Sequence, residues 1–312
     1  MLLALAAVAC SGEEVGPSEQ SAATTATEAG SPAPRTVIPI RGRPSAVAYA
    51  DGVLWVADDE RGLVHRLDPA DGEAAGEPVA VSSQPTALAA GAGLLWVTDA
   101  AGAVSALDTQ TAQARHERLD VGGVLVTVAA DGDGAWVGDI EAGTVRSIDG
   151  VTGLVGPEVR VPAGVVRVEL VGQVLWVSGL EATVTPVRTD TLAVGEAVAV
   201  GQAPIGMVAD GGLLWVANSD SDSVSRVDVT TGKRRGEDAV VGSAPIAIAI
   251  VGHEAWALDQ DGPSLTRLDA RTAVRLGSTL ELPMRPRGLA VTPGGVWVVG
   301  VDPSLAVLYV PR

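Results

Sequence analysis

The sequence predicts an all-β protein, a seven-bladed β-propeller built from four-stranded antiparallel blades. A single tryptophan recurs at an almost constant spacing, and each repeat holds only short apolar runs broken by turn residues. The two ends of the chain also supply complementary parts of one repeat. The spacings of 41, 40, 40, 39, 41 and 41 residues separate Trp55, Trp96, Trp136, Trp176, Trp215, Trp256 and Trp297, a period that is typical of propellers.

One repeat contains all four strands of a blade. The unit around Trp215 predicts an inner strand over 205–209, a second strand over 213–218, a third over 223–228 and an outer strand near 238–241. Asp-Gly pairs at 51–52 and 210–211 predict tight turns between the first two strands, because both residue types tolerate positive φ. The four strands therefore form an antiparallel meander.

The seventh blade is predicted to close the ring with strands from both ends of the chain. The third strand of that blade is expected over 305–310, after which the chain ends. The spacing at which outer strands precede each tryptophan assigns 36–40 to the missing fourth strand. This pairing would remove an open sheet edge, and Pro39 agrees with it because outermost strands tolerate proline.

Residue size along the repeat agrees with the same architecture. Inner strands carry small residues such as Ala46 and Ala48, because seven strands that converge on one axis leave little room. Each tryptophan is predicted to fill the wedge between neighbouring blades, where burial of about 150–250 Å² contributes at most about 4–6 kcal/mol. Since the chain has no phenylalanine, the tryptophans are the main large residues of the core.

The repeat resembles a known family. The stretch "PIGMVADGGLLWVANSDSDSVSRVDVTTGK" is similar to the repeat of the YVTN-type β-propellers, and the signature strand stands here as WVAD, WVTD, WVGD, WVSG, WVAN, WALD and WVVG. The resemblance covers residues 35–312 and implies the propeller fold. It implies little about activity, because such scaffolds serve many functions.

The first ten residues predict an export signal. Nine apolar residues are far short of the roughly 20 that a membrane-spanning helix needs, and the segment from Ala7 to Cys10 resembles the bacterial lipobox, which implies lipidation of Cys10. Ala7 stands where leucine is usual and no basic residue precedes the apolar run, so a free buried cysteine and a start upstream of Met1 are left open. Residues 11–34, with four Glu and no Lys or Arg, predict a disordered tether before the propeller at 35–312.

Composition limits the partners and the location. The chain has 21 Lys and Arg against 38 Asp and Glu, a net charge of -17, which opposes binding to nucleic acid or to an anionic membrane surface. We therefore expect no nucleic-acid partner, membrane contact only through the lipid anchor, and a monomer. Cys10 is the only cysteine, so no internal disulfide can form. The predicted location is extracytoplasmic, on the cell surface or in the periplasm.

Acidic and amide side chains end the second strand of most repeats, at the top face, which is formed by the loops between second and third strands and by the connections between blades. A ring of carboxylates there would attract cations or a basic peptide, whereas the alternative is that each is an ordinary turn residue. The segment 218–223 begins like a calcium loop, but neither register has the glycine and glutamate that an EF-hand requires. The candidate ligand-binding residues are Asp58, Asp99, Asp139, Asn218 and Asp259.

Repeats three and four depart from the pattern. Leu125 and Val165 replace the proline that begins the inner strand, and the small inner positions of repeat four become Arg167 and Glu169. A charged pair on a strand crowded against the axis requires partners or water. We predict that Arg167 and Glu169 either contact a ligand or form an internal salt bridge.

Three arginines form a second candidate site. Arg43, Arg285 and Arg287 fall on connections that flank the point of closure, where they would hold a carboxylate or phosphate. The alternative is that they neutralise neighbouring aspartates.

No catalytic residue is predicted. The streptogramin lyases, which this scaffold also resembles, depend on a His, a Glu and a magnesium ion at the top face, but His65, His116 and His253 fall at scattered positions. No cofactor is expected, although a divalent metal is left open. The sequence favours a non-catalytic binding or sensing scaffold for an unknown protein, peptide or small molecule, with a metal-dependent lyase or hydrolase and a structural cell-envelope protein as alternatives.

Overall fold

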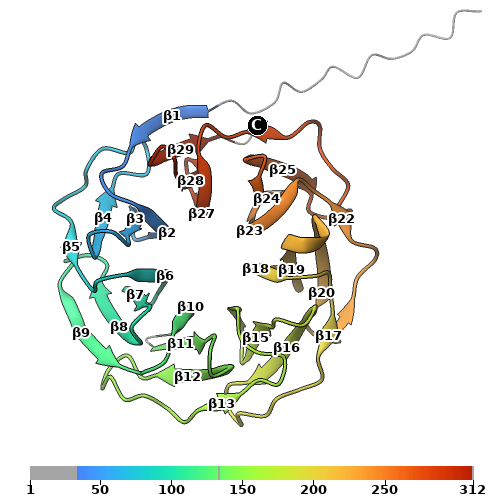
Figure 1. Cartoon of the computed structure of the whole chain (residues 1–312), viewed down its shortest axis with the longest axis horizontal. Coiled ribbons are helices and arrows are strands. Elements are labelled where there is room, and N and C mark those ends of the chain that lie inside the picture. Colours follow the sequence, from blue (N-terminus) through green and yellow to red (C-terminus); the bar gives the residue numbers. More distant parts are fainter. Residues whose placement is uncertain (1–33, 133, 311–312) are drawn as a thin grey trace, which may run out of the picture. The chain divides into compact units, whose positions relative to one another are not determined.

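The computed structural model describes residues 34–132 and 134–310, which form the predicted seven-bladed propeller (Figure 1). In each blade the first strand lies at the axis and the last lies at the circumference. Cys10 and the predicted leader over 1–10 lie outside the described residues, as does the tether except for Pro34. Within the described ranges, no helix is both long and apolar enough to cross a membrane.

In blades 1 to 6 the strands follow the order of the chain, whereas in blade 7 the first strand of the described chain lies outermost. Blade 1 consists of β2 (Pro44–Ala50), β3 (Val53–Asp58), β4 (Leu63–Leu67) and β5 (Val79–Ala80). Blade 2 consists of β6 (Pro85–Gly91), β7 (Leu94–Asp99), β8 (Ala103–Asp108) and β9 (Ala114–Asp120). Blade 3 consists of β10 (Leu125–Asp131), β11 (Gly134–Asp139), β12 (Thr144–Ile148) and β13 (Val159–Arg160). Blade 4 consists of β14 (Arg167–Val171), β15 (Val174–Ser178), β16 (Thr183–Arg188) and β17 (Val198–Ala199). Blade 5 consists of β18 (Pro204–Asp210), β19 (Leu213–Asn218) and β20 (Ser223–Asp228), and its outer edge is made of two short strands that both pair with β20, namely β21 (Lys233–Arg234) and β22 (Ala239–Val240). Blade 6 consists of β23 (Ser243–Val251), β24 (Glu254–Asp261), β25 (Ser264–Asp269) and β26 (Leu280–Glu281). Blade 7 consists of β27 (Arg285–Thr292), β28 (Gly295–Val301), β29 (Leu305–Tyr309) and β1 (Pro34–Pro39).

The ring closes as the sequence predicts. The N-terminal strand β1 pairs antiparallel with β29, with Ile38 opposite Ala306. Just beyond β1, the amide of Ile40 donates a hydrogen bond of 3.0 Å to the carbonyl of Ser304. The seventh blade is therefore built from both ends of the described chain, and its third strand is not left as an open edge.

The turns between first and second strands have the expected chemistry, with one correction. Asp51 and Gly52 have φ values of 46° and 81°, as a type I′ hairpin turn requires. In blade 5 the turn residues are Gly211 and Gly212, with φ of 55° and 79°, whereas Asp210 is still the last residue of β18. The predicted Asp-Gly turn is therefore displaced by one residue in that blade.

Each tryptophan packs between two blades, as predicted. The buried apolar residues of the described chain fall into seven clusters, and each contains one tryptophan together with residues of the adjacent blade. Trp55, for example, packs with Leu88 and Leu95 of blade 2. None of the seven tryptophans is more than 2% exposed. The core is therefore a ring of inter-blade wedges.

The inner strands are crowded against one another. Each contacts the inner strand of the next blade around the ring. A Cβ atom added to Gly206 would lie 2.7 Å from the Cα of Ala247 in the next blade, a separation that real side chains do not adopt. This crowding confirms that small residues at the axis are a packing requirement.

Six of the seven inner strands contain a β-bulge near the top face. The register shifts by one residue after the first or second residue pair, which leaves one residue of the inner strand unpaired. The unpaired residues are Ser45, Thr86, Val126, Ile205, Ile246 and Arg287. Blade 4 is the exception, because β14 has five residues, begins at Arg167 and shows no register shift.

Candidate functional site

The carboxylates that the sequence placed on an exposed rim are mostly buried. The side chain of Asp139 is half-buried, and the other four candidates are no more than 1% exposed. The four buried residues are Asp58, Asp99, Asn218 and Asp259. They are turned into the blades, so the expectation that these residues form the acidic lining of the mouth is corrected.

In blades 1 to 3 these carboxylates hold the top loops in place. Asp58 Oδ1 accepts hydrogen bonds from the backbone amides of Arg43 (3.0 Å), Glu60 (3.1 Å) and Arg61 (3.2 Å). Asp139 Oδ1 likewise accepts from Val124 (3.3 Å), Glu141 (2.9 Å) and Ala142 (3.1 Å). Each carboxylate thus joins its own loop to the preceding inter-blade connection, which is the structural role that turn-forming aspartates commonly have.

Asp99 stabilises its own loop with a different set of donors. Its Oδ1 accepts the amides of Ala101 (2.9 Å) and Ala103 (2.8 Å) within its own loop. Its Oδ2 lies 3.5 Å from the guanidinium of Arg118 on the outer strand β9. All of these partners are groups of the same blade, so Asp99 stabilises the blade rather than presenting a charge at the mouth.

In blades 5 and 6 a pair of hydroxyls takes the place of the amides. Asp259 Oδ2 accepts hydrogen bonds from Ser264 Oγ (3.2 Å) and Thr266 Oγ1 (2.7 Å), and Thr266 Oγ1 in turn accepts the amide of Gly242 (3.1 Å). Burial raises the pKa of Asp259 to about 6, although the two hydroxyls oppose the shift. Asp259 Oδ1 is buried without a partner among the described residues.

A glycine in the connection makes room for four of these five side chains, Asp58, Asp139, Asn218 and Asp259. A Cβ on Gly42 would collide with the carboxylate of Asp58, and one on Gly201 would lie 2.6 Å from Asn218 Cγ. Blade 7 reverses the arrangement, because a Cβ on Gly300 would lie 2.5 Å from Met284 Cγ. The exchange of glycine and a larger side chain between these two positions is visible in the repeats of the sequence.

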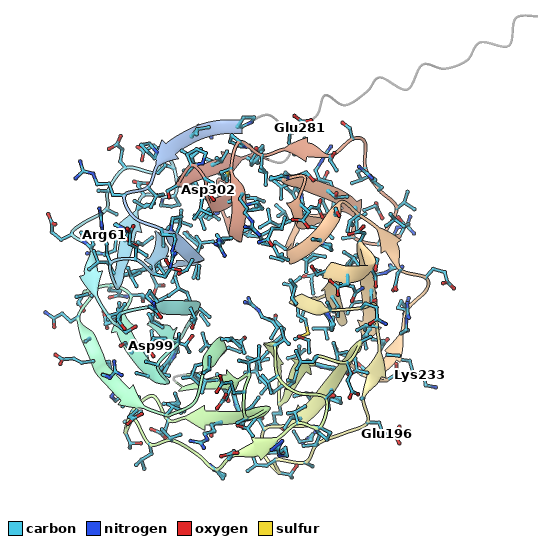
Figure 2. The ribbon with its side chains drawn as sticks, in the orientation of Figure 1. Arg61, Asp99, Glu196, Lys233, Glu281 and Asp302 are labelled. Carbon is cyan, nitrogen blue, oxygen red and sulfur yellow. The ribbon has the colours of Figure 1, made fainter. Side chains whose placement is uncertain are left out.

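The exposed charges of the top face are sorted into two sectors. On the top loops and connections of blades 7 and 1 the exposed basic residues are Arg41, Arg43 and Arg61, accompanied by the exposed acids Glu60 and Asp302. Arg285 and Arg287 are also exposed there, but they lie on β27 rather than on the connection that the sequence predicted. On the top loops and connections of blades 3 to 6 the exposed charges are all acidic, namely Glu141, Glu181, Asp220, Asp222 and Asp261. Figure 2 shows Arg61 on blade 1 and Asp302 on the neighbouring blade 7.

The three arginines of the second candidate site do not converge on a common partner. Arg43 Nε lies 2.5 Å from Asp59 Oδ1, as the alternative of charge neutralisation expects. Arg285 donates a hydrogen bond of 3.4 Å to Gln260 Oε1, and Arg287 is the exposed bulge residue of β27. These contacts bring Arg43 and Arg285 to different partners rather than to a common anion site.

Arg167 and Glu169 lie at the axis of the propeller. They stand two residues apart on the inner strand β14, so both side chains project from the same face of that strand. Glu169 Oε1 accepts the amide of Ala209 on the inner strand of blade 5 at 3.1 Å. Both residues retain partial solvent exposure. The axis therefore carries one acidic and one basic group that solvent can reach.

The predicted salt bridge between the two is not formed. In the described part of the chain no ion pair within 4.0 Å and no hydrogen bond involves the guanidinium of Arg167, and its Nε is buried without a partner. Burial lowers the pKa of Arg167 and raises that of Glu169, while the attraction between the two charges opposes both shifts. The guanidinium still carries its charge, because arginine is not deprotonated in proteins.

An unusual residue of blade 3, Thr127, makes a hydrogen bond to the strand β14 that carries Arg167 and Glu169. Thr127 occupies the position that is alanine or glycine in most inner strands, and its Oγ1 accepts the amide of Val168 on β14 at 3.1 Å. The inner strand is the free edge of its blade, so its outward amides point toward the axis. Thr127 and Glu169 each satisfy one such amide of the next blade.

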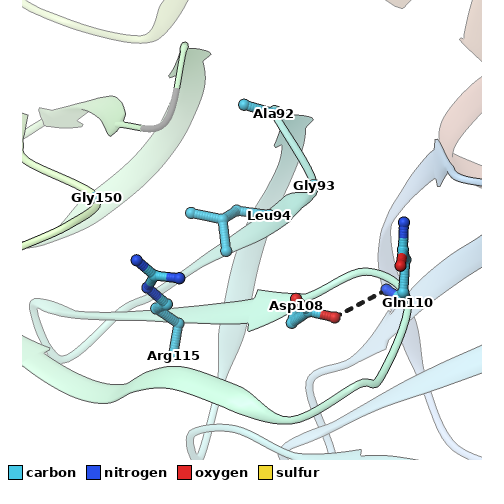
Figure 3. Close-up of a pocket in the computed structure, with 7 residues that line it drawn as sticks. All are labelled: Ala92, Gly93, Leu94, Asp108, Gln110, Arg115 and Gly150. Carbon is cyan, nitrogen blue, oxygen red and sulfur yellow. Dashed lines mark hydrogen bonds between the residues drawn. The ribbon is translucent and has the colours of Figure 1, made fainter.

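Three open cavities lie away from the axis. Figure 3 shows one of about 220 Å³, lined by Leu94, Asp108, Gln110 and Arg115 of blade 2 and by Gly150 of blade 3. A groove of about 550 Å³ lies between the outer parts of blades 4 and 5, where Figure 2 shows Glu196 and Lys233 at the circumference. A third, of about 500 Å³, follows the closure seam beside Ile38 and His65.

The three histidines lie in three separate blades. His65 Nε2 is 3.4 Å from Asp58 Oδ2 inside blade 1, and His116 Nε2 is 3.0 Å from the carbonyl of Gly150 at the outer edge of blade 2. His253 is exposed in the turn between β23 and β24. Across 34–132 and 134–310, no group of three or more His, Cys, Asp or Glu side chains is arranged to hold a metal ion.

Comparison with known proteins identifies the fold. No family model matches the chain, and no curated protein matches it in sequence. The virginiamycin B lyase from Staphylococcus aureus superposes with a TM-score of 0.76 at 13% identity, covering 88% of this chain and 98% of the lyase. A streptogramin B lyase superposes with a TM-score of 0.73 at 16% identity, covering 88% of this chain and 95% of the lyase. The computationally designed Ika8 protein superposes with a TM-score of 0.64 at 14% identity, covering 89% of this chain and 99% of the designed protein. At these identities the likeness shows the fold alone.

Proposed function

We propose that this chain is a non-catalytic binding protein that takes a small molecule or peptide at the top of the propeller axis, where Arg167 is the group that binds it. The observation that carries this proposal is the guanidinium of Arg167, which is half-buried at the axis without a hydrogen-bond or ion-pair partner in the described chain. A charged group in such a place has lost much of its hydration without a compensating contact. A ligand anion would supply that contact.

The other blades indicate that the fold does not need a charge there. At the position of Arg167 the remaining blades have Ala46, Ala87, Thr127, Gly206, Ala247 and Gly288. All six build the same inner strand and the same contact with the next blade. Arg167 is therefore better explained by a ligand than by the architecture.

The enzyme alternative has no comparable observation in its favour. A lyase of the kind that the scaffold resembles needs a histidine and a glutamate that act together at the top face, whereas the three histidines belong to blades 1, 2 and 6. The similarity to solved lyases extends to the fold only. We further propose that the protein works outside the cytoplasm on a lipid anchor at Cys10, with no nucleic-acid partner and as a monomer.

The proposal is tested by removing the guanidinium. The full-length protein and its Arg167→Ala variant, which copies blades 1, 2 and 6, are screened by thermal shift against small carboxylates, amino acids, dipeptides and inorganic phosphate. Arg160→Ala, at an exposed position on β13, is the control. We expect a compound that binds the wild type and the control alike but binds Arg167→Ala at least about tenfold more weakly. Equal binding by all three proteins, or chemical turnover of the compound, contradicts the proposal.

A further inference from the structure

We infer that the ligand of the axial site is a small zwitterion, an amino acid or short peptide whose carboxylate binds Arg167 and whose ammonium group binds Glu169. This inference rests on the proposed function, since it names the chemistry of the same site. It starts from the observation that the two charges are neighbours on β14 and yet are not paired with each other within 4.0 Å. A ligand that bridges them must carry both signs of charge.

The spacing of the two groups suits a single small molecule. Residues two apart on a strand are separated by about 7 Å along the strand, and both side chains leave the same face of β14. The distance is bridged by no direct ion pair within 4.0 Å in the described residues. It is short enough for one ligand with a carboxylate and an ammonium group in the same molecule.

Each group has unused hydrogen-bonding capacity. The guanidinium of Arg167 offers five donors in a planar fork that matches a carboxylate. Glu169 uses Oε1 for the amide of Ala209, which fixes the orientation of the side chain. Its second oxygen, Oε2, has no hydrogen bond from the described residues and is available to an ammonium group. The site therefore presents a cation receptor and an anion receptor side by side.

Electrostatics favours a ligand that is neutral as a whole. A simple anion on Arg167 would lie close to the carboxylate of Glu169, and a simple cation on Glu169 would lie close to Arg167. In both cases like charges would meet in a partly desolvated site. A zwitterion satisfies both groups at once, and the repulsion against single charges gives the site its selectivity.

The surroundings leave room for a slender ligand. Of the two inner strands beside β14, β18 carries Gly206 and β10 carries Thr127 at the position of Arg167, and both side chains are smaller than arginine. One residue nearer the mouth than the position of Arg167, blades 3 to 6 carry the half-buried apolar residues Val126, Val166, Ile205 and Ile246. We therefore expect amino acids with small or apolar side chains to bind better than charged ones.

The test uses three forms of one probe. L-leucine, N-acetyl-L-leucine, which lacks the ammonium group, and L-leucinamide, which lacks the carboxylate, are titrated into the full-length protein by calorimetry, followed by the same forms of alanine and valine and by Leu-Leu. We expect at least one free amino acid or the dipeptide to bind, with a loss of about tenfold or more for each blocked form.

Two variants that each remove one charge assign the groups. Glu169→Gln retains an acceptor for the amide of Ala209 and should remove the penalty for N-acetylation, whereas Arg167→Met should remove the penalty for amidation. Circular dichroism and melting curves confirm that both remain folded. If a probe depends on Arg167 but its N-acetyl form binds the wild type equally well, the zwitterion inference fails and the proposed function stands. If no probe binds in a manner that depends on Arg167, the inference is overturned, and the wider panel then decides the proposed function.

Discussion

Asn218 and Asp259 occupy the same position in adjacent blades and contact the same pair of hydroxyl positions on the following strand. Asn218 Nδ2 donates to Ser223 Oγ (3.2 Å) and Ser225 Oγ (2.9 Å), whereas Asp259 Oδ2 accepts from Ser264 Oγ (3.2 Å) and Thr266 Oγ1 (2.7 Å). Both side chains are fully buried, and each has one oxygen without a partner among the described residues. The two sites differ mainly in the charge that Asp259 can carry.

Asp259→Asn should stabilise the protein at neutral pH and remove part of its pH dependence. Burial raises the pKa of Asp259 from 3.8 to about 6, so between these values the folded state holds a proton that the unfolded state has lost. The free energy of unfolding therefore falls as pH rises through this window, by roughly 3 kcal/mol at most. Urea unfolding at pH 4.5 and pH 8 measures the effect. The reverse change, Asn218→Asp, should lower stability at pH 8 more than at pH 4.5, and an unchanged pH profile in both variants contradicts this account.

Gly242→Ala should destabilise blade 6 by about 1–3 kcal/mol, the usual range for an overpacked site. The new Cβ would collide with the carboxylate of Asp259. The double variant with Asp259→Gly copies the glycine of blades 4 and 7 and should recover much of the loss. Gly294→Ala is the control, because its Cβ would find the nearest atom at 3.6 Å. Urea unfolding of the four proteins completes a double-mutant cycle, and strict additivity would show that the two positions do not interact.

Ile40→Ala should weaken the closure of the ring. Ile40 is 8% exposed and packs with Trp297 and Leu54 where blades 7 and 1 meet, so its truncation should cost about 2–4 kcal/mol. Val37→Ala, on β1 but 50% exposed, should change stability by less than about 0.5 kcal/mol. Thermal unfolding distinguishes the two, and equal effects would mean that the seam is not held by burial.

Cys10→Ser tests the proposed anchor. If Cys10 carries the lipid, the variant expressed in a bacterial host that processes lipoproteins should move from the membrane fraction to the medium or the periplasm. Cell fractionation and immunoblotting provide the measurement, with Ser11→Ala as the matched control. Retention of both variants in the membrane fraction contradicts the anchor.

The fold could be predicted because its signals are local and repeated. The tryptophan spacing, the turn residues and the alternation of small and large side chains are all read within about 40 residues, and the closure follows from the same offsets. Trp215 and Ile38 lie where the sequence predicts them. The seven-fold repetition adds weight to each local inference.

The direction of a side chain at the top face could not be predicted in the same way. Whether Asp58 is exposed depends on Gly42, which lies on the preceding inter-blade connection and leaves space for the carboxylate. The choice between a salt bridge and an open site at Arg167 and Glu169 likewise depends on the path of β14 and on the amide of Ala209. Both are contacts between blades, and strand patterns describe each blade separately.

The position of the tryptophans also determines how the ring must unfold. Every wedge belongs to two blades, as Trp55 does when it packs against Leu88 and Leu95, so loss of one blade exposes apolar surface on both of its neighbours. Because β1 joins β29 by hydrogen bonds and apolar packing rather than by a peptide bond, the molecule has no privileged starting blade. A circular permutant that links residue 310 to residue 34 and opens the chain at 82–84 would keep all seven inter-blade wedges. We therefore expect the ring to unfold as one cooperative unit.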